Sequence, residues 1–223
     1  MSKRTHSVAL GLLSVLVGAG CAQRFGRDSR LRLVERAPAE LSAATAPFRG
    51  QAIRLRQSVI LSVQGREQLL SGLLVLDPEA GTAQLLASQD LGPVLLALSV
   101  SADGHTLLRP APPPYDSPFL AAGVAASVRR MFLAGPLPLE TTFRRGWRVY
   151  QGWSGVGPAA QRYRLDREPL VLLEVAGQSA KGPWRVTYGS YRQTPVGLLP
   201  MALVYEEPAN RLRVTVWNES VER

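Results

Sequence analysis

The chain has 223 residues, of which 46% are hydrophobic and 19% charged, and its formal net charge is +9. This length suits one domain with a sizeable core, and the positive charge is almost all arginine, because Lys3 and Lys181 are the only lysines. The single cysteine, Cys21, excludes an intramolecular disulfide and a metal site built from several cysteines.

The first twenty residues have the pattern of an export signal. Lys3 and Arg4 precede 13 uncharged residues, 8–20, too few for a bilayer core that needs about 20 but suited to the apolar region of a secretory signal. Small residues then lead directly into Cys21, whereas an ordinary signal peptide or a buried N-terminal helix needs no cysteine there. The pattern resembles the lipobox of bacterial lipoproteins, although the lipobox favours Leu where Gly18 stands. This resemblance implies a lipid on Cys21.

The residue after the cysteine bears on the destination of the chain. Ala22 stands there instead of Asp, which by resemblance to Gram-negative sorting rules implies the outer membrane, with the domain facing the periplasm. An exported chain does not meet nucleic acid, so two explanations of its positive charge remain. The arginines bind anionic lipid head groups, or they merely solvate exposed strands. We therefore divide the chain into a signal peptide (1–20), a lipidated cysteine with a tether (21–47) and a domain (48–223).

Strands begin at about residue 51. In 51–63, Ile53, Leu55, Val59 and Leu61 alternate with polar residues, which is the period of a half-buried strand. Short turns then separate four further predicted strands, at 67–76, 82–89, 93–101 and 105–109. Such short connections favour antiparallel pairing.

The second half of the chain repeats this pattern. It predicts strands at 147–153, 161–166, 170–175, 184–192, 201–206 and 211–217. About ten strands at this spacing predict an α+β, mostly β fold: a curved antiparallel sheet or incomplete β-barrel, closed by one or more helices.

One clear helix is predicted between the two halves. Asp116 or Ser117 can cap it, Pro118 suits its first turn, and Gly135 with Pro136 ends it. An apolar stripe at helical spacing must face the sheet. A shorter helical piece is expected around residues 31–41.

Catalytic signals are sparse. His105 is the one histidine after the signal, and no phosphate-binding loop or GxSxG elbow occurs. Asp166, Glu168 and Glu174 cluster only loosely. We therefore predict that the protein is not an enzyme and holds no metal or cofactor, with a hydrolase built around His105 and Asp166 as the third alternative.

Several predicted strands are apolar on both faces, as in residues 73–76 and 94–98. One sheet with one helix does not easily cover both faces, so we expect an apolar cavity. The order of elements over residues 50–220 also resembles the LolA and LolB family of lipoprotein carriers. The resemblance rests on the meander 70–104, on the helix end and following segment 131–139, and on the closing segments 188–191, 197–201 and 208–216.

This resemblance implies an apolar interior that accepts the acyl chain of a lipid or lipoprotein, such as palmitate, and the N-terminal cysteine matches LolB. Burial of the chain gives about 0.8 kcal/mol per methylene, so transport needs no covalent chemistry. We expect nine residues on the helix stripe and facing strands to line the cavity: Leu74, Leu76, Leu96, Leu98, Phe119, Leu120, Val124, Met131 and Phe132. The alternative is an accessory lipoprotein of an envelope or export assembly, with protein partners and a filled core.

Overall fold

The computed structural model describes residues 32–33, 36–89 and 92–223. Within these ranges, thirteen strands form one antiparallel sheet, in the order β1-β7-β8-β9-β10-β11-β12-β13-β2-β3-β4-β5-β6. The strands are β1 Arg32–Leu33, β2 Ile53–Val63, β3 Arg66–Asp77, β4 Thr82–Ser88, β5 Val94–Ser101, β6 His105–Leu107, β7 Phe143–Arg145, β8 Val149–Ser154, β9 Gln161–Asp166, β10 Leu172–Ser179, β11 Gly182–Thr194, β12 Gly197–Glu207 and β13 Leu212–Glu222. The helices are α1 Pro38–Ala44 and α2 Pro118–Phe132.

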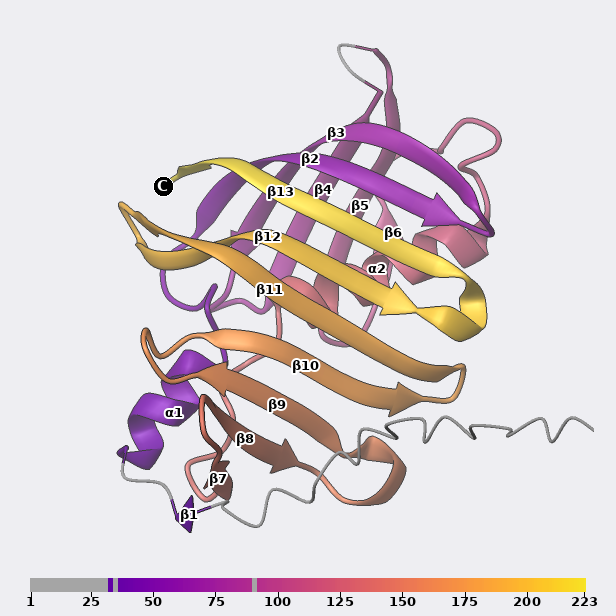
Figure 1. Cartoon of the computed structure of the whole chain (residues 1–223). Coiled ribbons are helices and arrows are strands. Elements are labelled where there is room, and N and C mark those ends of the chain that lie inside the picture. The colour runs from indigo at the N-terminus through magenta and orange to yellow at the C-terminus, as the bar shows by residue number, and fades with distance from the viewer. Residues whose placement is uncertain (1–31, 34–35, 90–91) are drawn as a thin grey trace, which may run out of the picture.

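The sheet is made of two meanders joined by one long-range pairing. β2 to β6 and β7 to β13 each follow chain order, and β13 pairs with β2 along its whole length, with Val214 opposite Leu61. β1 and β6 are the two edges, so the curved sheet stays open, and α2 lies behind β12 and β13 in the view of Figure 1. The predicted curved, mostly β fold is confirmed, and each of the eleven predicted strands is present.

Strand pairing decides which apolar residues face inward. Leu55 lies opposite Leu74, and Leu74 lies opposite Leu85, so these three form one row on the concave face. Leu73 and Leu86 pair on the opposite, convex face and remain partly exposed. β3 and β4 therefore have one buried face and one partly exposed face, whereas in β5 both faces are buried, with Leu95 and Ala97 on one and Leu96 and Leu98 on the other.

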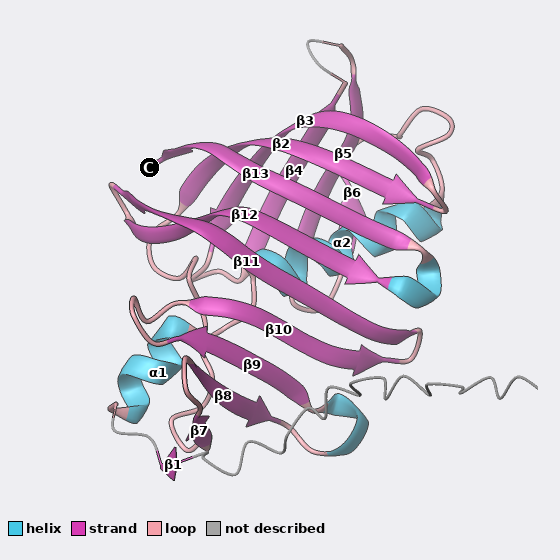
Figure 2. Ribbon diagram, viewed as in Figure 1, coloured by secondary structure: helices cyan, strands magenta, loops and turns pink. Residues whose placement is uncertain are grey.

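The predicted central helix is present as α2, from Pro118 to Phe132. Pro118 occupies the first turn, where its missing N–H costs nothing. The N-cap residue Ser117 makes no side-chain capping bond. The buried face of α2 is rich in Ala and Gly, which allows close approach to the sheet: a Cβ on Gly123 would lie 3.1 Å from Leu212 Cδ2. Figure 2 shows α2 against the curved sheet and α1 beside β8 and β9.

The region before residue 48 differs from the expected tether. Residues 38–44 form helix α1, and Leu41 and Phe48 are buried in the core, so the packed domain begins before residue 48. The helical piece expected at 31–41 begins only at Pro38, because Arg32–Leu33 pair with β7 as a strand. β1 and β7, of two and three residues, are too short to show alternation.

Residues 1–31, including the predicted signal and Cys21, lie outside the described residues. In the described part of the chain, no helix combines the length and hydrophobicity needed to cross a membrane.

Candidate functional site

A cavity of about 40 Å³ lies between α2 and the concave face of the sheet. Its apolar lining comes from α2 and five strands: Val59, Leu61, Leu70, Leu74, Leu85, Ala87, Leu96, Val124, Val128, Met131, Phe132, Val214 and Val216. The two polar lining residues direct their hydrogen bonds elsewhere. Gln57 Nε2 donates to Asn218 Oδ1 at 2.9 Å, and Ser127 Oγ donates to the Val124 carbonyl at 2.7 Å. A guest here would meet almost only hydrocarbon.

The structure gathers five of the nine expected cavity residues around this space: Leu74, Leu96, Val124, Met131 and Phe132. Leu76 and Leu98 are fully buried but lie farther along their strands, away from the cavity. Phe119 and Leu120 instead line a groove at the start of α2.

This groove lies between the β2–β3 hairpin and the start of α2, and has a volume of about 730 Å³. Its walls are Leu61, Val63, Gln64, Arg66, Glu67, Gln68, Pro114, Tyr115, Ser117, Phe119 and Leu120. Leu61 lines both the groove and the inner cavity, so the two spaces adjoin at this side chain. Phe119 is 44% exposed, and Lys181 Nζ lies 5.0 Å from its ring centroid. The groove is therefore lined by both apolar and polar side chains and lies beside the apolar cavity.

The opposite end of α2 is held by a polar cluster that we call the α2 latch: Arg130, Trp184, Tyr188, Tyr205 and Glu207. Arg130 Nη1 lies 3.6 Å from Glu207 Oε1 and donates to the Tyr205 hydroxyl, and its guanidinium carbon lies 4.4 Å from the centroid of the Trp184 ring. The Tyr188 hydroxyl donates to the carbonyls of Arg130 and Met131, at 3.2 and 3.3 Å. These contacts fix the last turns of the helix to β11 and β12.

Two tyrosines of the α2 latch have raised pKa values. Burial raises the pKa of Tyr188 well above its ordinary value. Burial also raises the pKa of Tyr205 to about 12, against the opposing effect of the Arg130 charge. Both hydroxyls therefore stay protonated at neutral pH.

Sequence reasoning missed part of the cavity wall and the whole α2 latch. Val59 and Leu61 were placed on one face of their strand, and Val214 and Val216 alternate in the same way, but only the β13–β2 pairing brings them beneath α2. No local pattern connects Arg130 with Glu207, which lie 77 positions apart in the sequence.

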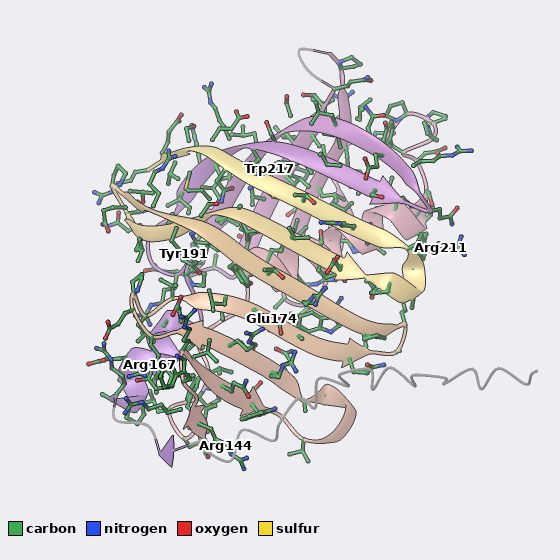
Figure 3. All side chains as sticks on the ribbon, in the orientation of Figure 1. Arg144, Arg167, Glu174, Tyr191, Arg211 and Trp217 are labelled. Carbon is green, nitrogen blue, oxygen red and sulfur yellow. The ribbon has the colours of Figure 1, made fainter. Side chains whose placement is uncertain are left out.

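The residues considered for catalysis lie apart. His105 is exposed on the edge strand β6, whereas Asp166 ends β9 near the other edge, so the structure does not bring them together. Glu174, labelled in Figure 3, forms ion pairs with Arg162 and Arg164, whose nitrogens lie 2.7 and 3.5 Å from its oxygens. Over the described ranges, no three His, Cys, Asp or Glu side chains are grouped to hold a metal ion.

Comparisons identify the fold. A LolA superfamily protein from Nitrosomonas europaea superposes with a TM-score of 0.53 at 9% identity, over 85% of this chain and 94% of that protein. The chain has a LolA-like fold. An outer membrane lipoprotein-sorting protein domain from Vibrio parahaemolyticus (TM-score 0.48, 12% identity, 83% of this chain and 91% of that one) and a DUF1329 family protein from Desulfovibrio piger (0.49, 8%, 83% and 91%) are also similar. No protein-family model matches the sequence, and no curated protein matches it.

The predicted resemblance is thus confirmed at the level of the fold. In the LolA-like half-barrel of this chain, the apolar cavity lies beneath the one long helix, and the groove opens beside that helix.

Proposed function

We propose that the protein is a lipid-anchored carrier, which takes the acyl chain of a lipid or lipoprotein into the cavity beneath α2 without catalysing a reaction. The observation that carries this proposal is the apolar cavity that meets the outer groove at Leu61. The likeness of the fold to the LolA superfamily protein from Nitrosomonas europaea agrees with a carrier in the cell envelope. The separation of His105 from Asp166 gives no support to a hydrolase.

Uptake of an acyl chain requires α2 to move. The cavity of about 40 Å³ holds roughly three water-sized molecules, far less than a long acyl chain. Burial of a chain of about sixteen carbons yields roughly 11 kcal/mol, at about 0.8 kcal/mol per methylene. That gain exceeds the few kcal/mol expected from the polar contacts of the α2 latch. An arriving chain would thus supply enough free energy to release the polar contacts that hold this end of α2.

The anchor is the second part of the proposal. Cys21 follows the predicted signal and lies eleven positions before Arg32, the start of β1. A lipid on Cys21 would hold the carrier at a membrane, which we place at the periplasmic face of the outer membrane. Mass spectrometry of the mature protein from a bacterial host tests the modification directly.

The carrier proposal is tested on a chain that starts at Ala22, which retains every described element. We expect mass spectrometry to find fatty acid, phospholipid or acylated peptide in the purified protein, and a fluorescent fatty acid to bind and be displaced by palmitate. Ala87→Leu fills the cavity and should weaken binding of the fluorescent fatty acid by about tenfold or more, because Ala87 lines it. Ala202→Leu, on the convex face of β12, is the matched control and should bind normally.

The small cavity also favours a second candidate: an accessory lipoprotein with a filled core that binds envelope proteins. A stable protein that contains no lipid and binds no fluorescent fatty acid would support this alternative and overturn the carrier. Equal binding by wild type and Ala87→Leu would place the lipid site elsewhere, and would also count against the proposal.

A further inference from the structure

The positive charge is not spread evenly along the chain. Residues 22–223 carry a net charge of +7, because Lys3 and Arg4 lie before them. Residues 22–36 contain five arginines and two carboxylates, and residues 139–168 contain six arginines and three carboxylates. In residues 37–138, seven arginines balance seven carboxylates. Two segments that are distant in sequence therefore carry six of the seven net charges.

The fold brings the described residues 32–33 of the first segment against the second segment. β1 pairs with β7, with Arg32 opposite Arg145 and Leu33 opposite Arg144. β7 continues into β8 and β9 at the same edge of the sheet, seen at the bottom of Figure 1. We call β1, β7, β8, β9 and the loops within residues 139–168 the basic edge. It is the edge at which the chain arriving from Cys21 enters the fold.

The basic edge also exposes large apolar side chains. Leu139 is 63% exposed, Trp147 77%, Trp153 41% and Val156 90%. The Arg144 guanidinium carbon lies 5.7 Å from the centroid of the Trp153 ring. Both residues line a shallow depression of about 360 Å³ that also includes Pro138 and Gly155, the chain neighbours of Leu139 and Val156. An arginine and exposed apolar groups thus lie together around this depression, and Trp147 is exposed in the β7–β8 turn at the other end of the same strands.

Carboxylates weaken this positive surface only in part. Glu174 is buried to 8% exposure and pairs with both Arg162 and Arg164, so it neutralises one of these two arginine charges and leaves the other. Arg167 donates to the Trp147 carbonyl at 3.0 Å and supports the exposed β7–β8 turn. Arg144 and Arg167 both lie in the lower part of the sheet in Figure 3.

We propose that the basic edge docks on an anionic phospholipid surface, an inference that rests on the proposed lipid anchor at Cys21. Tryptophan and arginine side chains are favoured at the membrane interface, and each arginine near an anionic surface adds attraction. The eleven residue steps from Cys21 to Arg32 span at most about 40 Å, so a lipid on Cys21 keeps this edge close to the bilayer. Charge, apolar exposure and tether position all select the same surface.

The test measures vesicle binding of the chain that starts at Ala22, which has no anchor. We expect it to bind phosphatidylcholine vesicles that contain phosphatidylglycerol, to ignore vesicles of phosphatidylcholine alone, and to bind more weakly as salt rises. Arg144→Gln with Arg148→Gln should weaken binding by about thirtyfold. The matched control, Arg54→Gln with Arg109→Gln, removes the same charge outside the basic edge and should bind as wild type.

The apolar contribution has its own pair of variants. Leu139→Ser with Val156→Ser should weaken vesicle binding by about tenfold, because both exposed side chains lose contact with the acyl region. Leu69→Ser with Leu108→Ser removes two comparably exposed leucines outside the basic edge and should have no effect. Unchanged circular dichroism in all four variants would show that they are folded.

Equal loss of binding in the basic-edge variants and their controls, or equal binding to neutral and anionic vesicles, would overturn the docking proposal. The fluorescent fatty acid, measured in solution without vesicles, separates this result from the carrier function. Fatty-acid binding without vesicle binding would overturn only the docking surface. Vesicle binding without fatty-acid binding would support the docking surface and overturn only the carrier.

Discussion

Removal of the charge on Arg130 is the most informative perturbation of the α2 latch. Its side chain is 21% exposed, and the Glu207 side chain that it faces is 5% exposed. Arg130→Met keeps an unbranched stem but removes the ion pair, the hydrogen bond to Tyr205 and the cation–π contact with Trp184. It leaves Glu207 with a hydrogen bond from Ser179 Oγ at 3.4 Å.

The expected cost follows from burial. Loss of one partner from a fully buried ion pair costs about 3–5 kcal/mol, and the partial exposure of Arg130 lowers this to about 2–3 kcal/mol. The lost cation–π contact adds about 1 kcal/mol. Glu207→Gln alone leaves an arginine that still reaches water, and should cost about 1–2 kcal/mol. In Arg130→Met with Glu207→Gln no buried charge is left unpaired, so the two substitutions should be coupled by about 2 kcal/mol.

Two assays measure these effects. Urea unfolding of wild type, both single variants and the double variant gives the coupling free energy. Stopped-flow mixing with the fluorescent fatty acid gives the uptake rate, which should rise about tenfold in Arg130→Met because fewer contacts hold α2 closed. Arg129→Met is the control: its guanidinium bonds the carbonyls of Ser101 and Gly104, not Glu207, so it should show little coupling with Glu207→Gln.

A coupling below about 0.5 kcal/mol would refute the role of the ion pair, since distant residues are additive within that range. If the two substitutions are coupled as expected but Arg130→Met takes up the fatty acid at the wild-type rate, uptake does not require release of this end of α2.

Three further predictions concern the core and the buried tyrosines. Leu74→Ala and Leu76→Ala should each lower the free energy of unfolding by about 2–5 kcal/mol, but only Leu74→Ala extends the existing cavity and should bind benzene. Gly152→Ala should cost about 1–3 kcal/mol by denaturant unfolding, because its Cβ would lie 2.5 Å from Phe143 Cε1. The pKa of Tyr205 is raised to about 12 in the folded protein, so above pH 10 the unfolded chain loses this proton first. The stability that Tyr205 contributes is therefore complete below pH 10 and is lost as the pH rises towards 12. Over this interval Tyr205→Phe should lose less stability than wild type.

Each of these predictions has a contradicting result. Benzene binding by Leu76→Ala as strong as by Leu74→Ala would mean that the cavity is misplaced. Gly189→Ala is the control for Gly152→Ala, because nothing lies within 4 Å of its added Cβ, and an equal cost at both sites would exclude the ring clash. Parallel stability curves of wild type and Tyr205→Phe above pH 10 would exclude that tyrosine as the source of alkaline instability.

The sequence by itself determined the local elements of this protein. Alternation from Ile53 to Val63 specifies a strand, since side chains on a strand repeat every two residues, and Pro118 with an apolar stripe specifies α2. Turns such as Asp103–Gly104 require adjacent strands to be antiparallel. These features depend on neighbours along the chain, so the eleven longer predicted strands and the central helix were all found.

Only the tertiary structure decided which of these residues meet. Alternation shows that Val59 and Leu61 share a face, but the pairing of β13 with β2 and the position of α2 make that face the cavity wall, while Leu76 and Leu98 fall outside it. β1 pairs with β7 and β7 pairs with β8, and this pairing brings residues 32–33 of the first basic segment to the edge that carries the second. Contacts between distant segments leave no periodic signal in either segment, because each is selected by the free energy of the assembled sheet.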